Sequence, residues 1–382
     1  MNQSYGKVYL VGAGPGSPDL LTIRGAECLQ KADVVLYDRL AHPALLFHIP
    51  AHAKLIYCGK KPCAHTLRQE DIQNEMYIHA KRGKTVVRLK GGDPAVFGRV
   101  AEELTELAVR GIAYEIVPGI TAGSAAASYA GISLTHREYA HGYQVLTGHG
   151  KNPDEDRPAK WLQLAETTNT LIWYMGMKRL SHIASQLMLY GKDPHENVLV
   201  IEWATHRHQR TISGTLENIA EKVDDAAIKN PSIIIIGKVT RQHEALQWFH
   251  SSSVGGVLTF IQNDDERQAF EELKTSDMEV YISTHFTKDA SSFNNSMEIT
   301  KRLAEEKFIK HIVIPPTSEG MKLKENLSEL GNAEDISFWC TAESSEATSI
   351  SAITPLHTLN KDSKKWLGQF YDKEHLDEKA TV

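Results

Sequence analysis

Segments with the pattern of strands and of helices alternate through the first 125 residues, and this order limits the fold more than any other feature. Short apolar runs have the length of buried strands, and the longer segments between them have helical patterns. The strand candidates are 7–11, 33–36, 85–89 and 114–117, and the helix candidates are 22–32 and 100–110. Such alternation is typical of a parallel sheet with crossover helices, so we predict an α/β domain.

The same kind of pattern continues after a polar stretch at 148–158 that we interpret as a linker or surface loop. The later strand candidates are 170–174, 198–202, 211–214 and 232–236, followed by 257–261, 280–283, 311–314, 336–340 and 349–354, and helix candidates are 178–190 and 216–227. A Ser- and Gly-rich boundary at 249–256 separates the two groups. We therefore predict one region at 1–250, with halves at about 1–140 and 141–250, and a smaller C-terminal α/β domain at 256–382.

Length and cysteine content narrow the class of protein. The 382 residues exceed what one core usually organises. No apolar run reaches the length of a membrane span and the first residues lack the pattern of a signal peptide, so we expect a cytoplasmic protein without a membrane partner. The spacing of Cys58 and Cys63 fits no common zinc pattern, and His206 and His208 lack a ligand partner nearby in the sequence. We predict no metal, and we expect these histidines on the surface or in a strand.

Charge is distributed unevenly along the chain. The formal net charge is -6, and residues 251–382 hold 14 Lys+Arg against 23 Asp+Glu. Residues 51–100 instead hold ten basic and four acidic side chains. This local excess suits a polyanionic ligand, although a solvated basic face explains it equally well and nucleic acid stays open on charge alone.

A glycine-rich loop, GAGPG at 12–16, follows the first strand candidate. Its glycines permit a tight turn that lets a ligand approach the backbone closely. A dinucleotide fingerprint needs its third glycine at position 17, which is Ser17 here. Asp38 still leaves a nicotinamide oxidoreductase open, because it follows the second strand where such enzymes have a ribose-binding acid.

Later motifs give the glycine loop a more specific meaning. The strongest are VRLKGGDP at 87–94, VPGITAG at 117–123 and LTHREYA at 134–140. Shorter ones are VLYDRL at 35–40, GKK at 59–61, TGH at 147–149 and YMG at 174–176. Together they resemble the uroporphyrinogen-III C-methyltransferases of the tetrapyrrole methylase family over residues 5–245.

The resemblance implies a fold, a reaction and an assembly. It implies two α/β domains with S-adenosylmethionine bound in a cleft between them, and a homodimer. It implies that this methyl donor is used to methylate uroporphyrinogen III twice, which gives precorrin-2 for sirohaem or cobalamin synthesis. No nucleic acid partner is then expected.

The resemblance also implies which residues contact the methyl donor. By position they are Pro15, Gly91, Gly92, Asp93, Val96, Thr121, Ala122, Met175 and Ala204. Asp93 has a carboxylate that can hold a ribose or an ammonium group, and the small residues leave room for adenosine. Met175 offers a polarisable apolar wall, but simple core packing is an alternative for this residue.

Asp38 and Lys60 fall on the family positions for proton transfer, with Asp38 as acceptor and Lys60 as donor. A helix N-cap or a salt bridge to Arg39 is the alternative for Asp38, and an anchor for a substrate carboxylate is the alternative for Lys60. Uroporphyrinogen III carries eight carboxylates, so a basic site is expected. The candidates for binding them are Lys61, Arg88, Arg99 and Arg137.

Two departures from the family pattern bear on rate and substrate fit. Val100 and Ala101 replace a usual glycine pair, and Ser17 replaces a usual aspartate. The alternatives are a methyltransferase of the same fold with another acceptor, the oxidoreductase, and a tetrapyrrole-binding protein without turnover. Residues 256–382 weakly resemble half of a uroporphyrinogen-III synthase, and we expect a degenerate accessory domain.

Overall fold

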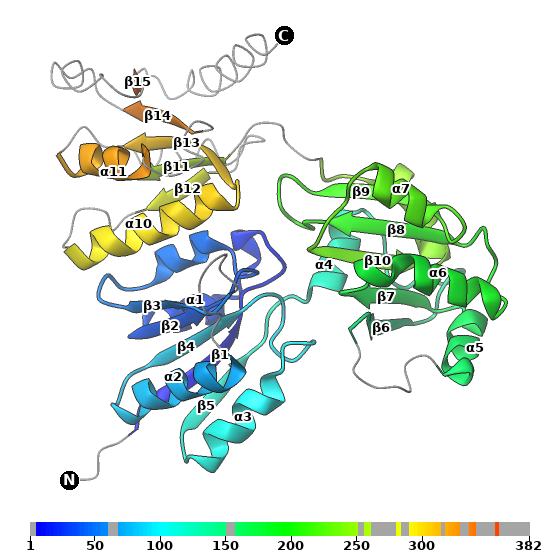
Figure 1. Cartoon of the computed structure of the whole chain (residues 1–382), viewed down its shortest axis with the longest axis horizontal. Coiled ribbons are helices and arrows are strands. Elements are labelled where there is room, and N and C mark those ends of the chain that lie inside the picture. Colours follow the sequence, from blue (N-terminus) through cyan, green and yellow to red (C-terminus); the bar gives the residue numbers. More distant parts are fainter. Residues whose placement is uncertain are drawn as a thin grey trace. The chain divides into compact units, whose positions relative to one another are not determined.

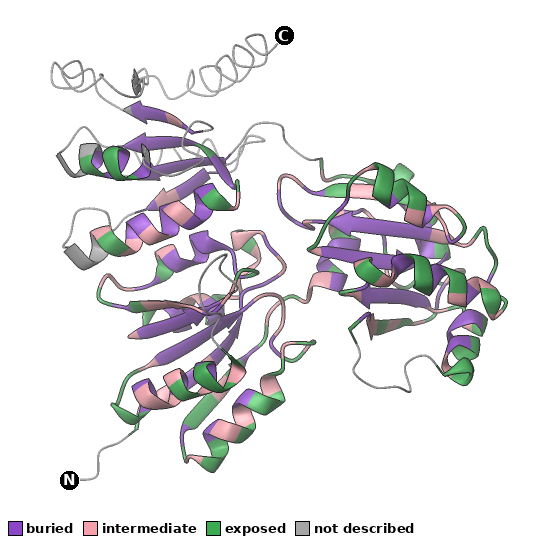
Figure 2. Ribbon diagram, in the orientation of Figure 1, coloured by how far each residue is buried: buried purple, intermediate pink, exposed green. Residues whose placement is uncertain are grey.

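The structure is a computed structural model that describes residues 5–59, 68–149, 157–250, 256–260, 280–283, 290–314, 318–328, 336–340 and 356–358. The described elements form three five-stranded sheets (Figure 1). In Figure 2 the central strands of each sheet are buried, while the helices of the first two sheets expose one face. Strands and helices alternate as expected, and the α/β class is confirmed.

The first sheet has the strand order β3-β2-β4-β1-β5. Its strands are β1 (Lys7–Gly12), β2 (Val34–Tyr37), β3 (Lys54–Tyr57), β4 (Val86–Lys90) and β5 (Ala113–Val117). Strand β1 pairs in parallel with both β4 and β5. Because carboxyl ends of parallel strands share one edge of the sheet, the loops after these three strands lie together.

The described residues of the first part form six helices. They are η1 (Pro18–Leu20), α1 (Ile23–Gln30), η2 (Pro43–His48), α2 (Gln69–Lys81), α3 (Val100–Val109) and α4 (Ala122–Tyr129). The alternation predicted only α1 and α3 among them. Helix α2 is rich in polar residues and α4 in small ones, so neither has a strong apolar stripe. Packing in the folded chain stabilises both.

The second sheet is mixed, with the order β6-β7-β10-β8-β9. Its strands are β6 (Tyr143–Thr147), β7 (Thr170–Tyr174), β8 (Asn197–Glu202), β9 (Arg210–Thr215) and β10 (Ser232–Ile236). Strand β10 pairs antiparallel with β7 and β8. Its helices are α5 (Pro158–Glu166), η4 (Met177–Arg179), α6 (Leu180–Leu189), α7 (Ile219–Asp225), η5 (Lys238–Gln242) and α8 (His243–Leu246).

The third sheet is parallel, with the order β12-β11-β13-β14-β15. Its strands are β11 (Gly256–Phe260), β12 (Val280–Ser283), β13 (Ile309–Ile314), β14 (Ser337–Cys340) and β15 (Leu356–Thr358), with helices α10 (Ala290–Glu305) and α11 (Ser318–Ser328). Four strand candidates of this region are confirmed within two residues at each end. The fifth, at 349–354, lies outside the described residues.

Contacts divide the chain into two compact units. One comprises Met1–Cys28, Leu36–His42 and Tyr57–Ser251, and the other comprises Leu29–Val35, Pro43–Ile56 and Ser252–Val382. Within the second unit, the Asn295 amide of α10 donates to the Ala51 and Ala53 carbonyls, both at 3.1 Å. No helix of the described residues is both long and apolar enough to cross a membrane.

Candidate methyl-donor and substrate site

Three loops of the first sheet touch at glycines. The Gly14 and Gly92 amides each donate to the other's carbonyl oxygen, at 3.2 and 2.6 Å, which joins the loops after β1 and β4. A Cβ added at Gly119, after β5, would lie 2.3 Å from the Gly92 oxygen and 2.8 Å from the Gly12 Cα. Any side chain at Gly119 would push these loops apart, so the motif glycines have a structural reason in addition to ligand access.

Asp93 fixes the loop after β4. Its Oδ1 accepts from the Ala95 amide at 2.8 Å and its Oδ2 accepts from the Gly119 amide at 3.0 Å. The carboxylate therefore ties the β4 loop to the β5 loop. Each carboxylate oxygen has capacity for a second hydrogen bond, so a ligand hydroxyl or ammonium group can still bind there.

Open space lies beside Gly92. This residue has φ +68°, and a Cβ placed on it would meet only the Ala122 amide, at 3.8 Å. Pro15, Gly91, Asp93 and Val96, which the sequence assigns to the methyl donor, are partly exposed on these same loops. The geometry fits a ligand that lies along the backbone between Gly92 and the start of α4.

Tyr174, at the end of β7, links the second sheet to the start of α4. Its hydroxyl lies 2.6 Å from Thr121 Oγ1 and accepts from the Gly123 amide at 2.5 Å. Burial raises the pKa of this hydroxyl, so it stays protonated. The next residue, Met175, is 41% exposed, so the core-packing alternative for it is wrong.

Left-handed backbone conformations gather at the loops of both halves. Five non-glycine residues of these loops have a positive φ: Phe97, Arg99, Met175, Trp203 and Thr205. Elsewhere in the described residues only Ala227 and Lys307 do. Such conformations cost free energy and concentrate at functional sites. The Phe97 and Tyr174 rings, 5.1 Å apart between centroids, bring two of these turns together.

The turn after β8 contacts the glycine loop. The Ser17 amide donates to Thr205 Oγ1 at 2.9 Å, and a Cβ on Gly16 would lie 2.3 Å from His206 Nε2. Ala204, in the same turn, is buried in an apolar cluster of the second half. The turn thus brings the predicted Ala204 position beside the loop that carries Pro15.

Three histidines stack next to this turn. The His206 ring lies 5.5 Å from that of His42 and 5.4 Å from that of His208. Burial lowers the pKa of all three, that of His42 to about 3. The expectation of surface or strand histidines is wrong for His206, because it is buried in a turn between strands.

Asp38 follows β2 and is oriented from two sides. Its Oδ1 accepts from the Leu40 amide at 3.0 Å, and Arg88 Nη2 donates to its Oδ2 at 3.4 Å. A Cβ on Gly91 would lie 2.6 Å from that of Leu40, so the loops after β2 and β4 also touch. Asp38 therefore forms an ion pair with Arg88, a different partner from the Arg39 that the sequence-based alternative named.

The predicted substrate residues differ in their surroundings. Arg88 is buried under Asp38, whereas Arg99 and Arg137 are exposed. Arg99 forms an ion pair with Glu102, with 2.9 Å between Nε and Oε1. Lys60 and Lys61 lie outside the described residues. Arg88 is thus placed to act on Asp38, and the two exposed arginines are accessible to a carboxylate-rich ligand.

The departure at Val100 and Ala101 has a simple structural setting. These are the first two residues of α3, and the left-handed residue before them is Arg99. Ordinary helical φ suits any residue with a Cβ. The replaced glycine pair is therefore compatible with this backbone.

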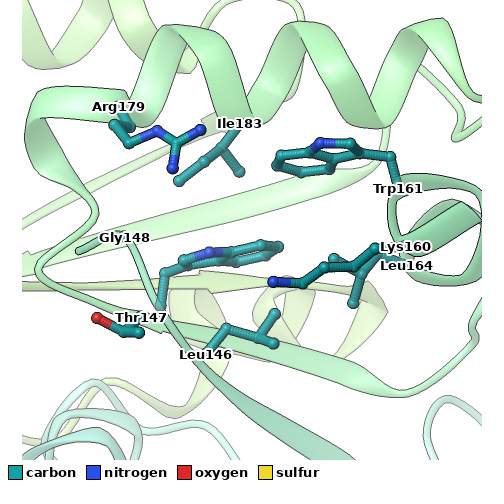
Figure 3. Close-up of a pocket in the computed structure, with 9 residues that line it drawn as sticks. Leu146, Thr147, Gly148, Lys160, Trp161, Leu164, Arg179 and Ile183 are labelled. Atoms are coloured by element: carbon teal, nitrogen blue, oxygen red, sulfur yellow. The ribbon is translucent and has the colours of Figure 1, made fainter. Parts of the chain in front are cut away.

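A separate pocket lies in the second half between the sheet and its helices (Figure 3). Two indole rings, Trp161 and Trp173, line it together with the cationic side chains of Lys160 and Arg179. It contains none of the residues predicted for the methyl donor or the substrate.

Among the described residues, no three His, Cys, Asp or Glu side chains form a group that could hold a metal ion.

Sequence reasoning missed several residues of this site. Tyr174, Thr205 and His42 were not assigned a role, and they join the two halves here. The YMG motif at 174–176 was the available signal for Tyr174. For Thr205 and His42 no local signal exists, because their partners are far away in the sequence.

Comparisons with known proteins agree with this arrangement. The chain is 47% identical over 273 residues to a uroporphyrinogen-III C-methyltransferase of Bacillus subtilis (strain 168), which covers 71% of this chain and 56% of the relative. It is 52% identical over 234 residues to one of Priestia megaterium, and the aligned region covers 61% of this chain and 98% of the relative. The chain thus spans about half the length of the first relative and nearly all of the second.

A solved structure shares the fold. It is a uroporphyrin-III C-methyl transferase from Thermus thermophilus complexed with S-adenyl homocysteine, at 40% identity and a TM-score of 0.53. The match covers 62% of this chain and 99% of that one. The model of the tetrapyrrole (corrin/porphyrin) methylase family matches residues 7–220. Since this match includes more than half of the chain, the chain belongs to the tetrapyrrole methylases.

Proposed function

We propose that this chain transfers methyl groups from S-adenosylmethionine to two ring carbons of uroporphyrinogen III, which gives precorrin-2 for sirohaem or cobalamin synthesis. The observation that carries the proposal is the meeting of the loops after β1, β2, β4 and β5 with the turn after β8. Most residues assigned to the methyl donor lie on these loops. Relatives at 47% and 52% identity with this activity support the choice of acceptor.

The methyl donor fits the space beside Gly92. Asp93 is available for a ribose or ammonium group, and Gly91, Gly92 and Ala122 leave room for adenosine. Pro15, Val96, Thr121, Met175 and Ala204 would complete its surroundings. Bound S-adenosylmethionine supplies an electrophilic methyl group, so the protein needs no nucleophile of its own and contributes by positioning and by excluding water.

Proton transfer is assigned to Asp38 and Lys60. Attack by an electron-rich pyrrole carbon leaves a cationic ring that must lose a proton, and an Asp38 carboxylate oxygen accepts it. Lys60 is the proposed donor. Lys61, Arg99 and Arg137 would bind substrate carboxylates, for which arginine is suited by its bidentate geometry.

The acceptor can be tested directly. The purified chain is incubated without oxygen with S-adenosylmethionine and uroporphyrinogen III, and the product is analysed by mass. We expect a dimethylated product. Protein that binds S-adenosylmethionine but adds no methyl group to uroporphyrinogen III would contradict the proposal and favour another acceptor. Membership of a methylase family argues against the nicotinamide oxidoreductase.

We also propose a homodimer. Strands β5 and β6 are at the edges of their sheets, and they expose Tyr114, Ile116, Tyr143 and Val145. Exposed apolar edge strands are unusual unless a partner covers them. Light scattering should give the mass of a dimer, and Ile116→Lys should shift it toward the monomer. A monomeric wild-type chain would contradict this proposal.

The domain division stays a proposal as well. We infer a methylase region at 1–250 and an accessory α/β domain at 256–382 that is similar to half of a uroporphyrinogen-III synthase. The parallel third sheet supports a separate α/β domain. Limited proteolysis should cut first between 250 and 256, and a first cut within either region would contradict the division. A cytoplasmic location stays a prediction.

A further inference from the structure

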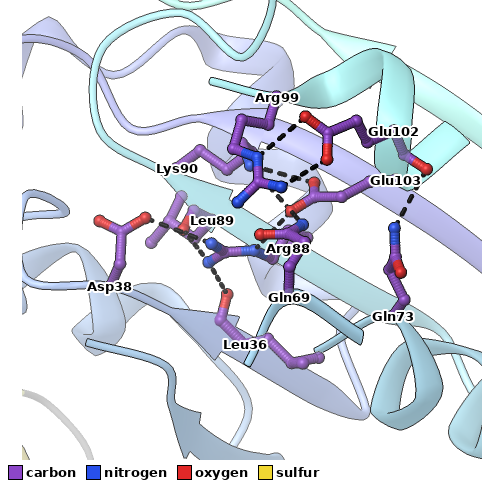
Figure 4. Close-up of polar contacts among 10 residues, drawn as sticks. All are labelled: Leu36, Asp38, Gln69, Gln73, Arg88, Leu89, Lys90, Arg99, Glu102 and Glu103. Atoms are coloured by element: carbon purple, nitrogen blue, oxygen red, sulfur yellow. Dashed lines mark hydrogen bonds and ion pairs between the residues drawn. The ribbon is translucent and has the colours of Figure 1, made fainter. Parts of the chain in front are cut away.

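A cluster of charged side chains is buried beneath Asp38 in the first half (Figure 4). Arg88 and Lys90 of β4 and Glu103 of α3 have side-chain exposures of 6%, 7% and 0%. Arg88 and Lys90 are two residues apart, so both side chains emerge on the same face of the strand. Charged residues are almost never this buried unless they are paired, so the cluster needs an explanation beyond the fold class.

Glu103 is at the centre of this cluster. Both of its carboxylate oxygens accept from Lys90 Nζ at 3.0 Å, and Oε1 also accepts from Gln69 Nε2 at 2.9 Å. Arg88 Nε lies 3.6 Å from Oε1. Burial lowers the pKa of Lys90, as does Arg88 nearby, whereas Glu103 raises it. The Glu103 charge therefore offsets two cations that would otherwise repel each other in a site with little water.

Arg88 connects Glu103 to Asp38. Its Nη2 donates to Asp38 Oδ2 at 3.4 Å, and its Nη1 donates to the Leu89 carbonyl at 3.1 Å. One guanidinium thus faces a buried carboxylate on one side and the proposed proton acceptor on the other. The Cys58 thiol nearby adds no charge, because burial raises its pKa to about 11.

We propose that Glu103 is a positioning residue for methyl transfer, acting through Arg88 to hold the Asp38 carboxylate in its reactive orientation. This rests on the proposed function, in which Asp38 accepts the proton. With Glu103 present, two cations and two carboxylates balance, and Arg88 is fixed by contacts on both sides. Without the Glu103 charge, Lys90 and Arg88 have Asp38 as the nearest remaining anion of the cluster, and the carboxylate is drawn toward them.

Energetics support a positioning role over a purely stabilising one. Replacing a buried ion pair with apolar residues of similar volume is often neutral or stabilising, so such pairs add little to stability by themselves. Removing only one partner leaves a buried charge without compensation. Glu103→Gln keeps the side-chain volume but leaves the buried Lys90 and Arg88 charges without this anion, so its effect on stability has to be measured beside its effect on turnover.

The test is a double-mutant cycle of Glu103→Gln with Asp38→Asn, measured as single-turnover methylation of uroporphyrinogen III and as binding of S-adenosylmethionine. In the wild-type background Glu103→Gln should slow turnover by roughly ten- to hundredfold, the value of a charged hydrogen bond, with little change in donor affinity. In the Asp38→Asn background it should cost less than about threefold, because residues that act as a unit are non-additive.

Equal losses in both backgrounds would overturn the proposal and leave Glu103 a structural residue. A wild-type rate for Asp38→Asn would instead overturn the proposed role of Asp38, so the two failures are distinguishable. Glu106→Gln is the matched control, since Glu106 is on the same helix in an accessible pair with Arg110. If Glu103→Gln does not fold, the cycle uses the pair Glu103→Leu with Lys90→Met, which removes both charges. Arg88 still loses its contact with Glu103 in this pair, so turnover should still fall, and it should fall less in the Asp38→Asn background.

Discussion

The two halves of the methylase region have different interiors. In the first half, the central strand β4 carries Arg88 and Lys90 into the core beside Glu103. In the second half, the matching face of the sheet is apolar, with Trp173, Val200 and Ile234 packed against helices. From this difference we infer that the two halves have different roles. The first half orients charged groups for the reaction, and the second half contributes a stable apolar core that holds the turns of the donor site. The predictions below test this inference.

Asp38→Asn should have the largest effect. Losing the proton acceptor should lower kcat by about 10² to 10⁴-fold, the usual contribution of general base catalysis. Binding of S-adenosylmethionine and the melting temperature should change little. Single-turnover assays measure the rate, and calorimetry measures donor binding and the melting temperature. Asp225→Asn, at an exposed position, is the control. A large loss of stability with normal turnover would reverse the roles that we assign to the two halves.

Ile234→Ala should affect the second half through stability alone. Ile234 is fully buried, and such a truncation removes about 2 to 5 kcal/mol from the free energy of unfolding. Denaturant melts measure the loss, and kcat per folded molecule should stay near wild type. The control is Leu189→Ala at an exposed position, which should change stability by about 0.5 kcal/mol or less. Turnover that fell as much as in Asp38→Asn would show that the frame also determines the chemistry.

The histidine stack makes the contact between the halves sensitive to acid. Because folding lowers the pKa of His42 from about 6.5 to about 3, its contribution to stability is complete above 6.5 and is lost as the pH falls toward 3. Between pH 7 and 5 this removes about 2 kcal/mol for one histidine. Unfolding measured at both pH values should be less pH-dependent in His42→Leu. The exposed His195→Gln should keep the wild-type dependence, and an unchanged slope in His42→Leu would contradict the assignment.

Tyr174→Phe should have the smallest effect. It removes the hydroxyl that binds Thr121 and Gly123 but keeps the ring. A lost hydrogen bond of this kind is worth about 1 kcal/mol, so S-adenosylmethionine should bind roughly fivefold more weakly. Calorimetric titration measures this, and Tyr190→Phe, at the residue that follows α6, is the control. Unchanged affinity would show that the second half does not shape the donor site through this residue.

Sequence reasoning reached the first half more completely than the second. Apolar runs of strand length predicted β1, β2, β4 and β5, and the parallel order follows from their alternation with helices. For the second half the same patterns predicted strands but not direction. The antiparallel pairing of β10 with β7 and β8 depends on which strands lie next to each other in the sheet. A buried strand has the same apolar sequence pattern in parallel and in antiparallel pairing, so the pattern does not predict the direction.

The site shows the same limit. Motifs predicted Asp38, Gly92 and Asp93, which the structure brings to one edge of the sheet. Arg88 had been assigned to the substrate, but its partners Asp38 and Glu103 lie 50 and about 15 positions away, so its burial between them was not visible. Lys60 and Lys61 stay predictions because they lie outside the described residues.

The left-handed turns have a consequence for protein engineering. Phe97, Met175 and Trp203 each hold a conformation that glycine adopts without strain, at a cost of about 1 kcal/mol or more per position. A laboratory selection for heat resistance would therefore favour glycine at these positions. The resulting enzymes would survive higher temperatures but would lose the side chains that line the methyl-donor loops, so selection for heat resistance alone would lower activity while raising yield.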